Sequence, residues 1–288
     1  MLLTILAFVA SLVPSVLIFV FLRKRHGNDK SKTENKPQDT TAQNNNEVRD
    51  DEPLPVPDEA RDREPSPVLT GLRAKPPSNA LTYRKHCLSA LLTGMLCTVP
   101  ILVLSGILYI LNNVLRATLL EGTSVLLYKA IYTFIVLALA EEIVKFFAFK
   151  LFLKKRPFAY TPEDMVAIMV ILGTGFGLLE SVVYAIGATP VIMLVRGVTV
   201  GHVGYGFLMG LFYSKRIQTG KKGYGFLAVL IPWLIHGLYD FSLSPELIEI
   251  NDNFAFLGVS LAILDIVLLI FMIRYFVKTK KEKAEVIS

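Results

Sequence analysis

Residues 140–145 read Ala-Glu-Glu-Ile-Val-Lys and place three ionisable side chains inside an apolar run that extends over residues 126–150. A charged side chain at the centre of a bilayer costs about 2.5 to 3.5 kcal/mol on insertion scales. Helical spacing puts Lys145 three residues after Glu142 and four after Glu141, so its ammonium can lie between the two carboxylates. One acid can pair with Lys145, which leaves the other as a candidate general base. A structural ion pair that holds helices together is the alternative interpretation.

Similar apolar windows recur along the whole 288-residue chain. Hydrophobic residues make up 53% of the sequence, whereas soluble domains contain about 45 to 50%. Because a transmembrane helix needs about 20 such residues, we expect an all-α, polytopic protein of the cell membrane that contacts the lipid bilayer. The seven expected transmembrane helices cover residues 2–22, 88–111, 126–150, 164–187, 191–213, 224–243 and 254–276.

Lysine and arginine fall at every second junction between these windows. Cytoplasmic flanks of membrane helices are enriched in both residues, so we expect the amino terminus outside and the carboxyl terminus in the cytosol. Most of the net charge of +6 comes from these flanks, where basic side chains can contact anionic lipid headgroups. The sequence has no patch of basic and aromatic residues that would indicate a nucleic-acid partner. The basic clusters lie at residues 23–25, 84–85, 154–156, 215–222 and 278–283. In the connections on the opposite side, 112–124, 188–190 and 244–253, the single Lys or Arg is Arg116.

Composition divides the chain into four segments. We expect a retained anchor helix at 1–22, a disordered cytosolic linker at 23–85, a six-helix membrane-embedded core at 86–276 and a basic cytosolic tail at 277–288. Residues 23–82 contain no aromatic residue and eight of the fifteen prolines, a composition that cannot bury enough apolar surface to order a backbone. We interpret the linker as a tether, with a docking or regulatory tail as the alternative.

The expected helix 164–187 carries a polar side chain on a face of small residues. Gly173, Gly177, Glu180 and Tyr184 follow one another at four, three and four residues, so they share one face. Small residues allow a neighbouring helix to approach closely, which would bury Glu180 and give Tyr184 a nearby hydrogen-bond partner. A structural role for Glu180 is the alternative.

Two histidines lie in later apolar windows. His202 occupies a glycine-rich stretch, and His236 precedes Asp240 by one helical turn, so the carboxylate can orient the imidazole. Interhelical hydrogen bonds without a catalytic role explain either histidine equally well. Asp265 has no partner at helical spacing, and we expect it to be structural or peripheral.

The glutamates and histidines of successive windows are the ingredients of two kinds of site. One is a water activated by glutamate and histidine; the other is a divalent metal held by His202 and His236, with one carboxylate left as base. The sequence lacks HExxH, so zinc is not demanded, and the choice between zinc and no metal stays open. The candidate catalytic residues are Glu141, Glu142, Glu180, His202 and His236, supported by Lys145, Asp240 and Tyr184.

The order of these motifs resembles the PrsW family of intramembrane proteases, which is similar to the CAAX-processing endoproteases and bacterial self-immunity proteins. The resemblance covers residues 86–276 and rests on Glu-Glu-x-x-Lys, Phe-x-x-x-Glu, His-x-x-x-Gly-x-x-x-Gly and His-x-x-x-Asp, which begin at residues 141, 176, 202 and 236. It implies a membrane-embedded peptidase that cuts another membrane protein, for example an anti-sigma factor. It also implies that Glu141 and Glu142 supply the base, that His202 and His236 stabilise the oxyanion or bind metal, and that Glu180 completes the cluster.

Two departures separate the chain from the CAAX enzymes, which usually carry Arg one position after Lys145 and His in place of Glu180. Both favour PrsW over a prenyl-protein processor. The competing functions are a proton-coupled transporter, in which the same side chains relay protons, and an inert immunity or scaffold protein of the same fold. The hydropathy pattern has no internal repeat of the kind that many transporters show.

Overall fold

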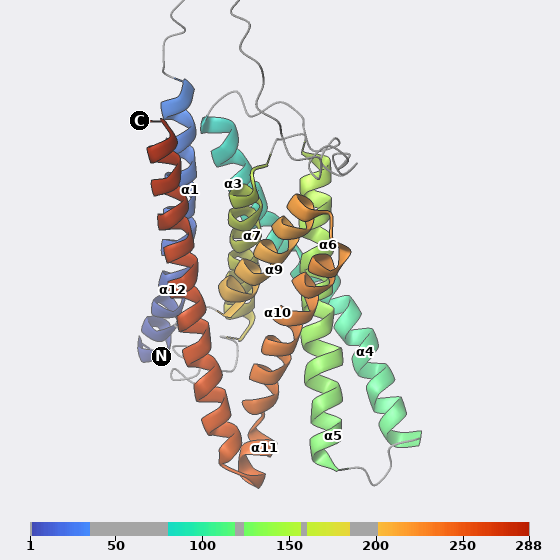
Figure 1. Cartoon of the computed structure of the whole chain (residues 1–288). Helices are drawn as coiled ribbons and strands as arrows, with labels where there is room; N and C mark the ends of the chain where they lie inside the picture. The colour runs from blue at the N-terminus through green and yellow to red at the C-terminus, as the bar shows by residue number, and fades with distance from the viewer. Residues whose placement is uncertain (1, 35–79, 119–123, 157–159, 185–200, 288) are drawn as a thin grey trace, which may run out of the picture.

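The computed structural model describes residues 2–34, 80–118, 124–156, 160–184 and 201–287, and these form a bundle of helices without a strand (Figure 1). The helices are α1 (Leu2–Glu34), α3 (Ala80–Leu96), α4 (Thr98–Thr118), α5 (Val125–Ala130), the π-helix η2 (Ile131–Leu139), α6 (Ala140–Lys155), α7 (Pro162–Tyr184), α9 (Gly201–Thr219), α10 (Lys222–Ser242), α11 (Pro245–Ile250) and α12 (Asn253–Ile287).

Five helical stretches among the described residues are long and apolar enough to cross a membrane. They also expose large apolar side chains: Leu102 and Ile110 of α4 are 61% and 63% exposed, which suits a lipid-facing surface. The chain is therefore a multi-pass membrane protein. The five stretches are Leu6–Lys24, Thr82–Thr118, Pro162–Val183, Lys222–Ser242 and Asn253–Thr279.

Two expected spans are not among these five. Window 126–150 is helical throughout but is divided among α5, η2 and α6 and contains five charged residues. Window 191–213 lies partly outside the described residues, which resume at Gly201. The number of seven spans and the orientation of the termini stay predictions.

The expected window 88–111 is divided at Cys97 into α3 and α4. Pro100 follows Cys97 by three residues; it has no N–H to donate, and its ring crowds the carbonyl four residues before it. The amide of Cys97 itself bonds to the carbonyls of both Thr93 and Gly94, at 3.0 and 3.2 Å. The proline thus explains a kink between two helices that form one apolar stretch, Thr82–Thr118.

Helices also extend beyond the segment boundaries that composition predicts. Helix α1 runs on to Glu34 and α3 begins at Ala80, so both ends of the expected 23–85 linker are helical; residues 35–79 lie outside the described part. The expected 277–288 tail continues α12 to Ile287. Lys, Glu and Ala are strong helix formers, and Lys278 pairs with Glu282 at 3.7 Å across one turn.

Helix α7 occupies the middle of the bundle, where α9, α3 and α1 pack against it (Figure 1). Its residues 164–176 are all buried. At two glycines, the backbones of the neighbouring helices α9 and α3 lie directly against α7. A Cβ atom on Gly173 would lie 2.3 Å from the carbonyl oxygen of His202, and a Cβ atom on Gly175 would lie 2.1 Å from that of Leu91. Gly173 therefore allows the close approach that fixes the position of α9, and of His202 with it, against α7.

Replacing Gly173 by Ala is expected to impair both stability and the position of His202. The added methyl group meets a backbone atom, so side-chain movement cannot relieve the clash, and overpacking of this kind costs about 1 to 3 kcal/mol. Gly106→Ala is the matched control, because a Cβ atom there has nothing within 4 Å. Thermal unfolding in detergent should show a lower midpoint for Gly173→Ala than for Gly106→Ala. Equal midpoints would contradict the close approach.

Candidate active site

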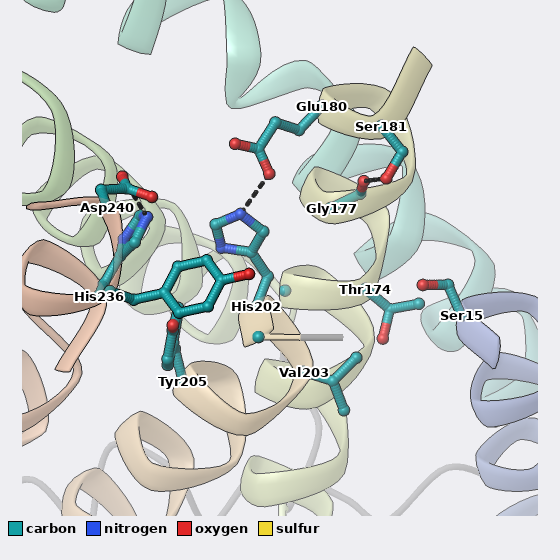
Figure 2. Close-up of a pocket in the computed structure, with 13 residues that line it drawn as sticks. Ser15, Thr174, Gly177, Glu180, Ser181, His202, Val203, Tyr205, His236 and Asp240 are labelled. Atoms are coloured by element: carbon teal, nitrogen blue, oxygen red, sulfur yellow. Dashed lines mark hydrogen bonds and ion pairs between the residues drawn. The ribbon is translucent and has the colours of Figure 1, made fainter. Parts of the chain in front are cut away.

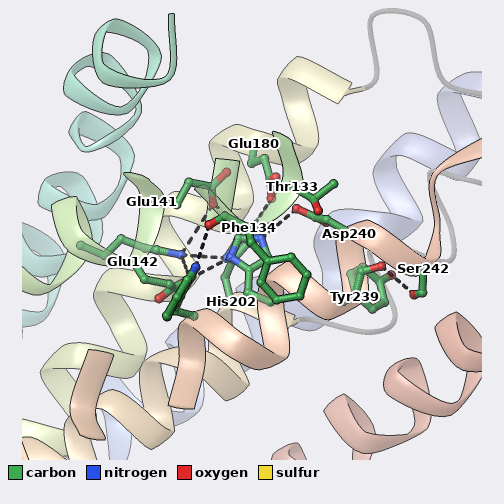
Figure 3. A network of polar contacts seen from close by, with 12 residues as sticks. Thr133, Phe134, Glu141, Glu142, Glu180, His202, Tyr239, Asp240 and Ser242 are labelled. Atoms are coloured by element: carbon green, nitrogen blue, oxygen red, sulfur yellow. Dashed lines mark hydrogen bonds and ion pairs between the residues drawn. The ribbon is translucent and has the colours of Figure 1, made fainter. Parts of the chain in front are cut away.

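The bundle brings seven ionisable side chains from four helices into one polar cluster (Figure 3). All seven are residues that the sequence singled out. Four of them lie on three helices other than α6, and helical spacing alone cannot bring different helices together. The polar cluster consists of Glu141, Glu142 and Lys145 from α6, Glu180 from α7, His202 from α9, and His236 and Asp240 from α10.

Glu142 is the buried centre of the polar cluster, with a side chain that is 1% exposed. Its Oε1 atom accepts a hydrogen bond of 2.6 Å from Lys145 Nζ. The same oxygen lies 3.0 Å from His236 Nδ1. Because burial of an unpaired charge is costly, this double contact is what makes a carboxylate tolerable in the apolar interior. The ring of Phe176 lies 4.6 Å from the Lys145 ammonium and covers it.

His202 is held from both sides of its ring. Nδ1 lies 3.1 Å from Lys145 Nζ, and Nε2 lies 2.5 Å from Glu180 Oε2. An ammonium can only donate, so Nδ1 acts as the acceptor and Nε2 carries the hydrogen that it donates to Glu180. Gly177 leaves room for this ring, because a Cβ atom there would lie 3.3 Å from it.

Asp240, one helical turn after His236, orients the imidazole of His236, as the sequence suggests. Its Nε2 atom lies 3.3 Å from Asp240 Oδ2 and 3.8 Å from Glu141 Oε2. The rings of His236 and His202 are 5.1 Å apart and nearly perpendicular. Two imidazoles from different helices therefore meet beside the glutamate pair.

Oε2 has no hydrogen-bond partner among the described residues in either glutamate, but Glu141 also lacks the short contacts that Glu142 makes through Oε1. Its closest charged contacts are Lys145 Nζ at 3.7 Å and His236 Nε2 at 3.8 Å. Its side chain is 11% exposed, against 1% for Glu142. The cluster thus contains one glutamate that is held by two short contacts and one whose charged contacts are all longer than 3.5 Å.

A small pocket of about 40 Å³ reaches the polar cluster from the side of α1 (Figure 2). Glu180, His202, His236 and Asp240 line it, and so does Ser15, which lies before the core segment that the sequence predicts. A single water needs at least about 10 to 15 Å³ of such volume. The pocket therefore has room for one reacting water beside the histidines.

The side chains present fit a divalent metal. Glu141, Glu142, His202 and His236 each offer a ligand atom, and these atoms all lie within 4.8 Å of one another. One oxygen of each glutamate is buried without a hydrogen-bond partner among the described residues. Imidazole and carboxylate donors suit zinc, and a metal on His202 would take the place of one of the two present contacts of that ring, to Lys145 or to Glu180.

Sequence reasoning missed two aromatic residues that shape the site. The ring of Tyr205 stacks on His236 at 5.0 Å and meets His202 edge-on at 5.7 Å. Trp233 donates from Nε1 to the carbonyl oxygen of Phe134 at 2.7 Å and so ties α10 to the π-helix η2. Trp233 is the single tryptophan of the chain, and its position one turn before His236 was the available signal.

Two residues named from the sequence, Tyr184 and Asp265, take no part in the described contacts of the polar cluster. Tyr184 ends α7, and its side chain lies outside the described residues. Asp265 is buried on α12, next to Tyr205 and Gly201, where neither carboxylate oxygen has a hydrogen-bond partner among the described residues. The two cysteines, Cys87 and Cys97, are free and buried.

Comparison with known proteins identifies three similar sequences. Protease PrsW of Clostridioides difficile is 34% identical over 154 residues, which cover 50% of this chain and 63% of that protein. Protease PrsW of Geobacillus kaustophilus is 25% identical over 144 residues, covering 49% and 64%. Protease PrsW of Oceanobacillus iheyensis is 30% identical over 122 residues, covering 40% and 57%. The chain thus matches less than two thirds of the length of each relative.

The model of one protein family matches a longer part of the chain. That family is described as PrsW family intramembrane metalloproteases, and the match extends over residues 83–274, which include all seven residues of the polar cluster. No solved structure matches the chain. Because the family match covers well over half of the sequence, the chain belongs to the PrsW family of intramembrane metalloproteases.

Proposed function

We propose that the protein is an intramembrane endopeptidase that hydrolyses a peptide bond in another membrane protein. The observation that carries the proposal is the pairing pattern of the polar cluster. Glu142 Oε1 is held by Lys145 and His236 at 2.6 and 3.0 Å, whereas the contacts of Glu141 to the same two residues are longer, at 3.7 and 3.8 Å, and leave its carboxylate able to accept. A carboxylate with free acceptor capacity next to two oriented imidazoles is suited to general-base chemistry on water.

In the proposed mechanism, Glu141 accepts a proton from the attacking water and later returns it to the amide nitrogen that leaves. Asp240 fixes the orientation of the His236 ring, and Glu180 does the same for His202. The Lys145 ammonium keeps Glu142 charged and in place. His202, His236 and Glu142 would hold a divalent metal, which polarises a carbonyl and acidifies a bound water when present.

Three finer features belong to the same proposal. The substrate is a membrane protein, for example an anti-sigma factor cut in regulated proteolysis. The chain crosses the membrane seven times, with its amino terminus outside and its carboxyl terminus and basic helix flanks in the cytosol. The 23–85 segment tethers the anchor helix to the core that cuts the substrate.

Reconstituted cleavage tests this function. The full chain is purified, placed in liposomes with single-span candidate substrates, and compared with His202→Ala. Loss of cleavage in His202→Ala, with retention in His86→Ala, is the expected result, because His86 contacts Phe152 and Tyr160 instead of the polar cluster. Cleavage that persists in His202→Ala would show that the polar cluster is not the active site.

Metal removal is expected to abolish cleavage reversibly. Two imidazoles and a carboxylate form a donor set that suits zinc, so a strong chelator should strip about one equivalent of metal from the wild type, as measured by elemental analysis. Added zinc should restore both metal content and cleavage. His236→Ala should retain much less metal than wild type before any chelator is added. Full cleavage by protein shown to be metal-free would contradict the metal assignment.

A further inference from the structure

A second cavity, of about 320 Å³, lies between the π-helix η2 and the junction of α10 with α11. At about 30 Å³ per water in the liquid, it has room for roughly ten water molecules. It is thus much larger than the pocket of about 40 Å³ beside the histidines. We call this cavity the α11 vestibule; its lining includes Lys129, Tyr132, Thr133, Asp240, Ser244 and Glu246.

The α11 vestibule connects the surface with the polar cluster. Exposure falls along its lining: the side chain of Glu246 is 52% exposed, that of Lys129 is 16% exposed, and Thr133 is 4% exposed. Asp240 belongs to the same lining, also lines the small pocket and contacts His236 at 3.3 Å. One side chain is therefore shared by the surface-connected cavity and the pocket beside the histidines.

An ion pair lies across the outer part of the α11 vestibule. Lys129 Nζ donates to Glu246 Oε1 at 2.6 Å and so links α5 to α11. The other carboxylate oxygen, Oε2, accepts from Ser244 Oγ at 2.9 Å. Both oxygens of Glu246 are thus held by residues of the lining, and we call this contact the latch.

The vestibule lies at the end of the bundle opposite the carboxyl terminus. Figure 1 shows α11 at the lower end of the bundle, and α12 runs from there to the carboxyl terminus at the upper end. Basic residues that the sequence assigns to the cytosol, such as Arg156 and Lys215, belong to helix ends away from α11. The α11 vestibule therefore opens on the face with few basic residues.

We propose that the α11 vestibule is the entrance through which water reaches the polar cluster, and that the latch between Lys129 and Glu246 restricts it. The proposal rests on the proposed function, because hydrolysis inside a membrane consumes a water that the hydrocarbon core does not supply. A cavity of this volume, lined by charged and hydroxyl groups as well as apolar ones and shared with the small pocket at Asp240, supplies it. Opening of the latch separates α5 from α11 and widens the entrance.

The carboxylate of the latch, Glu246, keeps its charge at ordinary pH. Hydrogen bonding from Lys129 is the main cause that lowers the pKa of Glu246 to about 2. A carboxylate with a lowered folded-state pKa stabilises its contact above its unfolded pKa and loses that effect as pH falls toward the folded value. Acidification to pH 5 therefore leaves the latch closed, whereas salt weakens an ion pair as exposed as this one.

Cysteine labelling tests the entrance without requiring proteolysis. Thr133→Cys places a thiol in the vestibule, and Ser214→Cys is the matched control. Both wild-type hydroxyls bond to a carbonyl of their own helix, and both residues are nearly buried, at 4% and 2% exposure. Only Thr133 lines the vestibule. The native Cys87 and Cys97 are buried, so the unsubstituted chain measures the background.

A membrane-impermeant methanethiosulfonate reagent is applied to either face of sealed vesicles of known orientation. We expect Thr133→Cys to react from the α11 face at least tenfold faster than Ser214→Cys, and not from the opposite face. Adding Glu246→Gln should raise the rate several-fold further. The charge-reversed pair, Lys129→Glu with Glu246→Lys, should return it to the starting value.

Equal labelling of the two cysteines, or labelling of Thr133→Cys from the opposite face, would overturn the proposed entrance. An unchanged rate in Glu246→Gln would overturn the latch. The labelling rates do not depend on cleavage, so failure of the proposed entrance can be distinguished from failure of the proposed peptidase function. If Thr133→Cys is labelled as expected in a protein that never cleaves a substrate, the proposed entrance is supported and the proposed peptidase function is contradicted.

Discussion

Replacing Glu141 by Gln is expected to lower the rate of peptide hydrolysis by about 10² to 10⁴-fold, the usual contribution of a general base. The amide keeps the shape of the carboxylate but cannot accept the proton of the attacking water. The folded structure should be nearly unaffected, because the charged contacts of Glu141 are long, at 3.7 and 3.8 Å. Cleavage assays and thermal unfolding of the same preparations check both parts of this expectation.

Glu142→Gln should behave differently from Glu141→Gln. Its carboxylate accepts from Lys145 at 2.6 Å and lies 3.0 Å from His236, so the amide weakens the charge-assisted pairing that holds a buried ammonium. Both stability and cleavage should fall. Glu249→Gln, an exposed position on α11, serves as control and should change neither. If Glu142→Gln lost cleavage at unchanged stability while Glu141→Gln remained active, the two roles would have to be exchanged.

Lys145→Met is expected to lower the free energy of unfolding by about 3 to 5 kcal/mol, the cost of removing one partner from a buried ion pair. Lys145 is 2% exposed and lies between Glu141, Glu142 and His202. Without it, the cluster retains several acids and no permanent cation. Lys150→Met on the same helix is the control, because Lys150 packs over Phe146 and Phe147 instead and should cost far less.

The unfolding measurement has a second arm in the presence of zinc. A ligand that binds the folded state alone stabilises it in proportion to its affinity, and a divalent cation would replace the positive charge that Lys145→Met removes. We expect zinc to recover part of the lost stability in this variant. A loss below 1 kcal/mol, equal to that of Lys150→Met, would show that the ammonium does not hold the acids together.

The contacts within single helices could be predicted from the sequence. Glu142 pairs with Lys145, and His236 lies near Asp240, because residues three and four apart share one face of a helix. The glycine face of α7 likewise indicated a close neighbour, and the structure places the backbone of His202 there. Local geometry fixes each of these relations before any tertiary packing forms.

The contacts between helices could not be predicted in the same way. That His236 meets Glu142, while His202 meets Glu180, depends on how α10 and α9 are rotated about their axes. The sequence also left open which glutamate is paired. Burial and unequal contacts now distinguish them, since Glu142 has short contacts to two cationic or imidazole groups and Glu141 has long ones.

The π-helix before the glutamate pair has a consequence for how this chain tolerates insertions and deletions. Residues Ile131–Leu139 form η2, and α6 continues directly from it with Glu141 and Glu142 in its first turn. Each residue of an α-helix advances the direction of its side chain by about 100°. Losing or gaining one residue in η2 would turn both carboxylates away from the imidazoles while leaving composition and hydropathy almost unchanged. The length of this apolar segment, more than its side chains, sets the rotation of α6 and hence the direction in which Glu141 and Glu142 point.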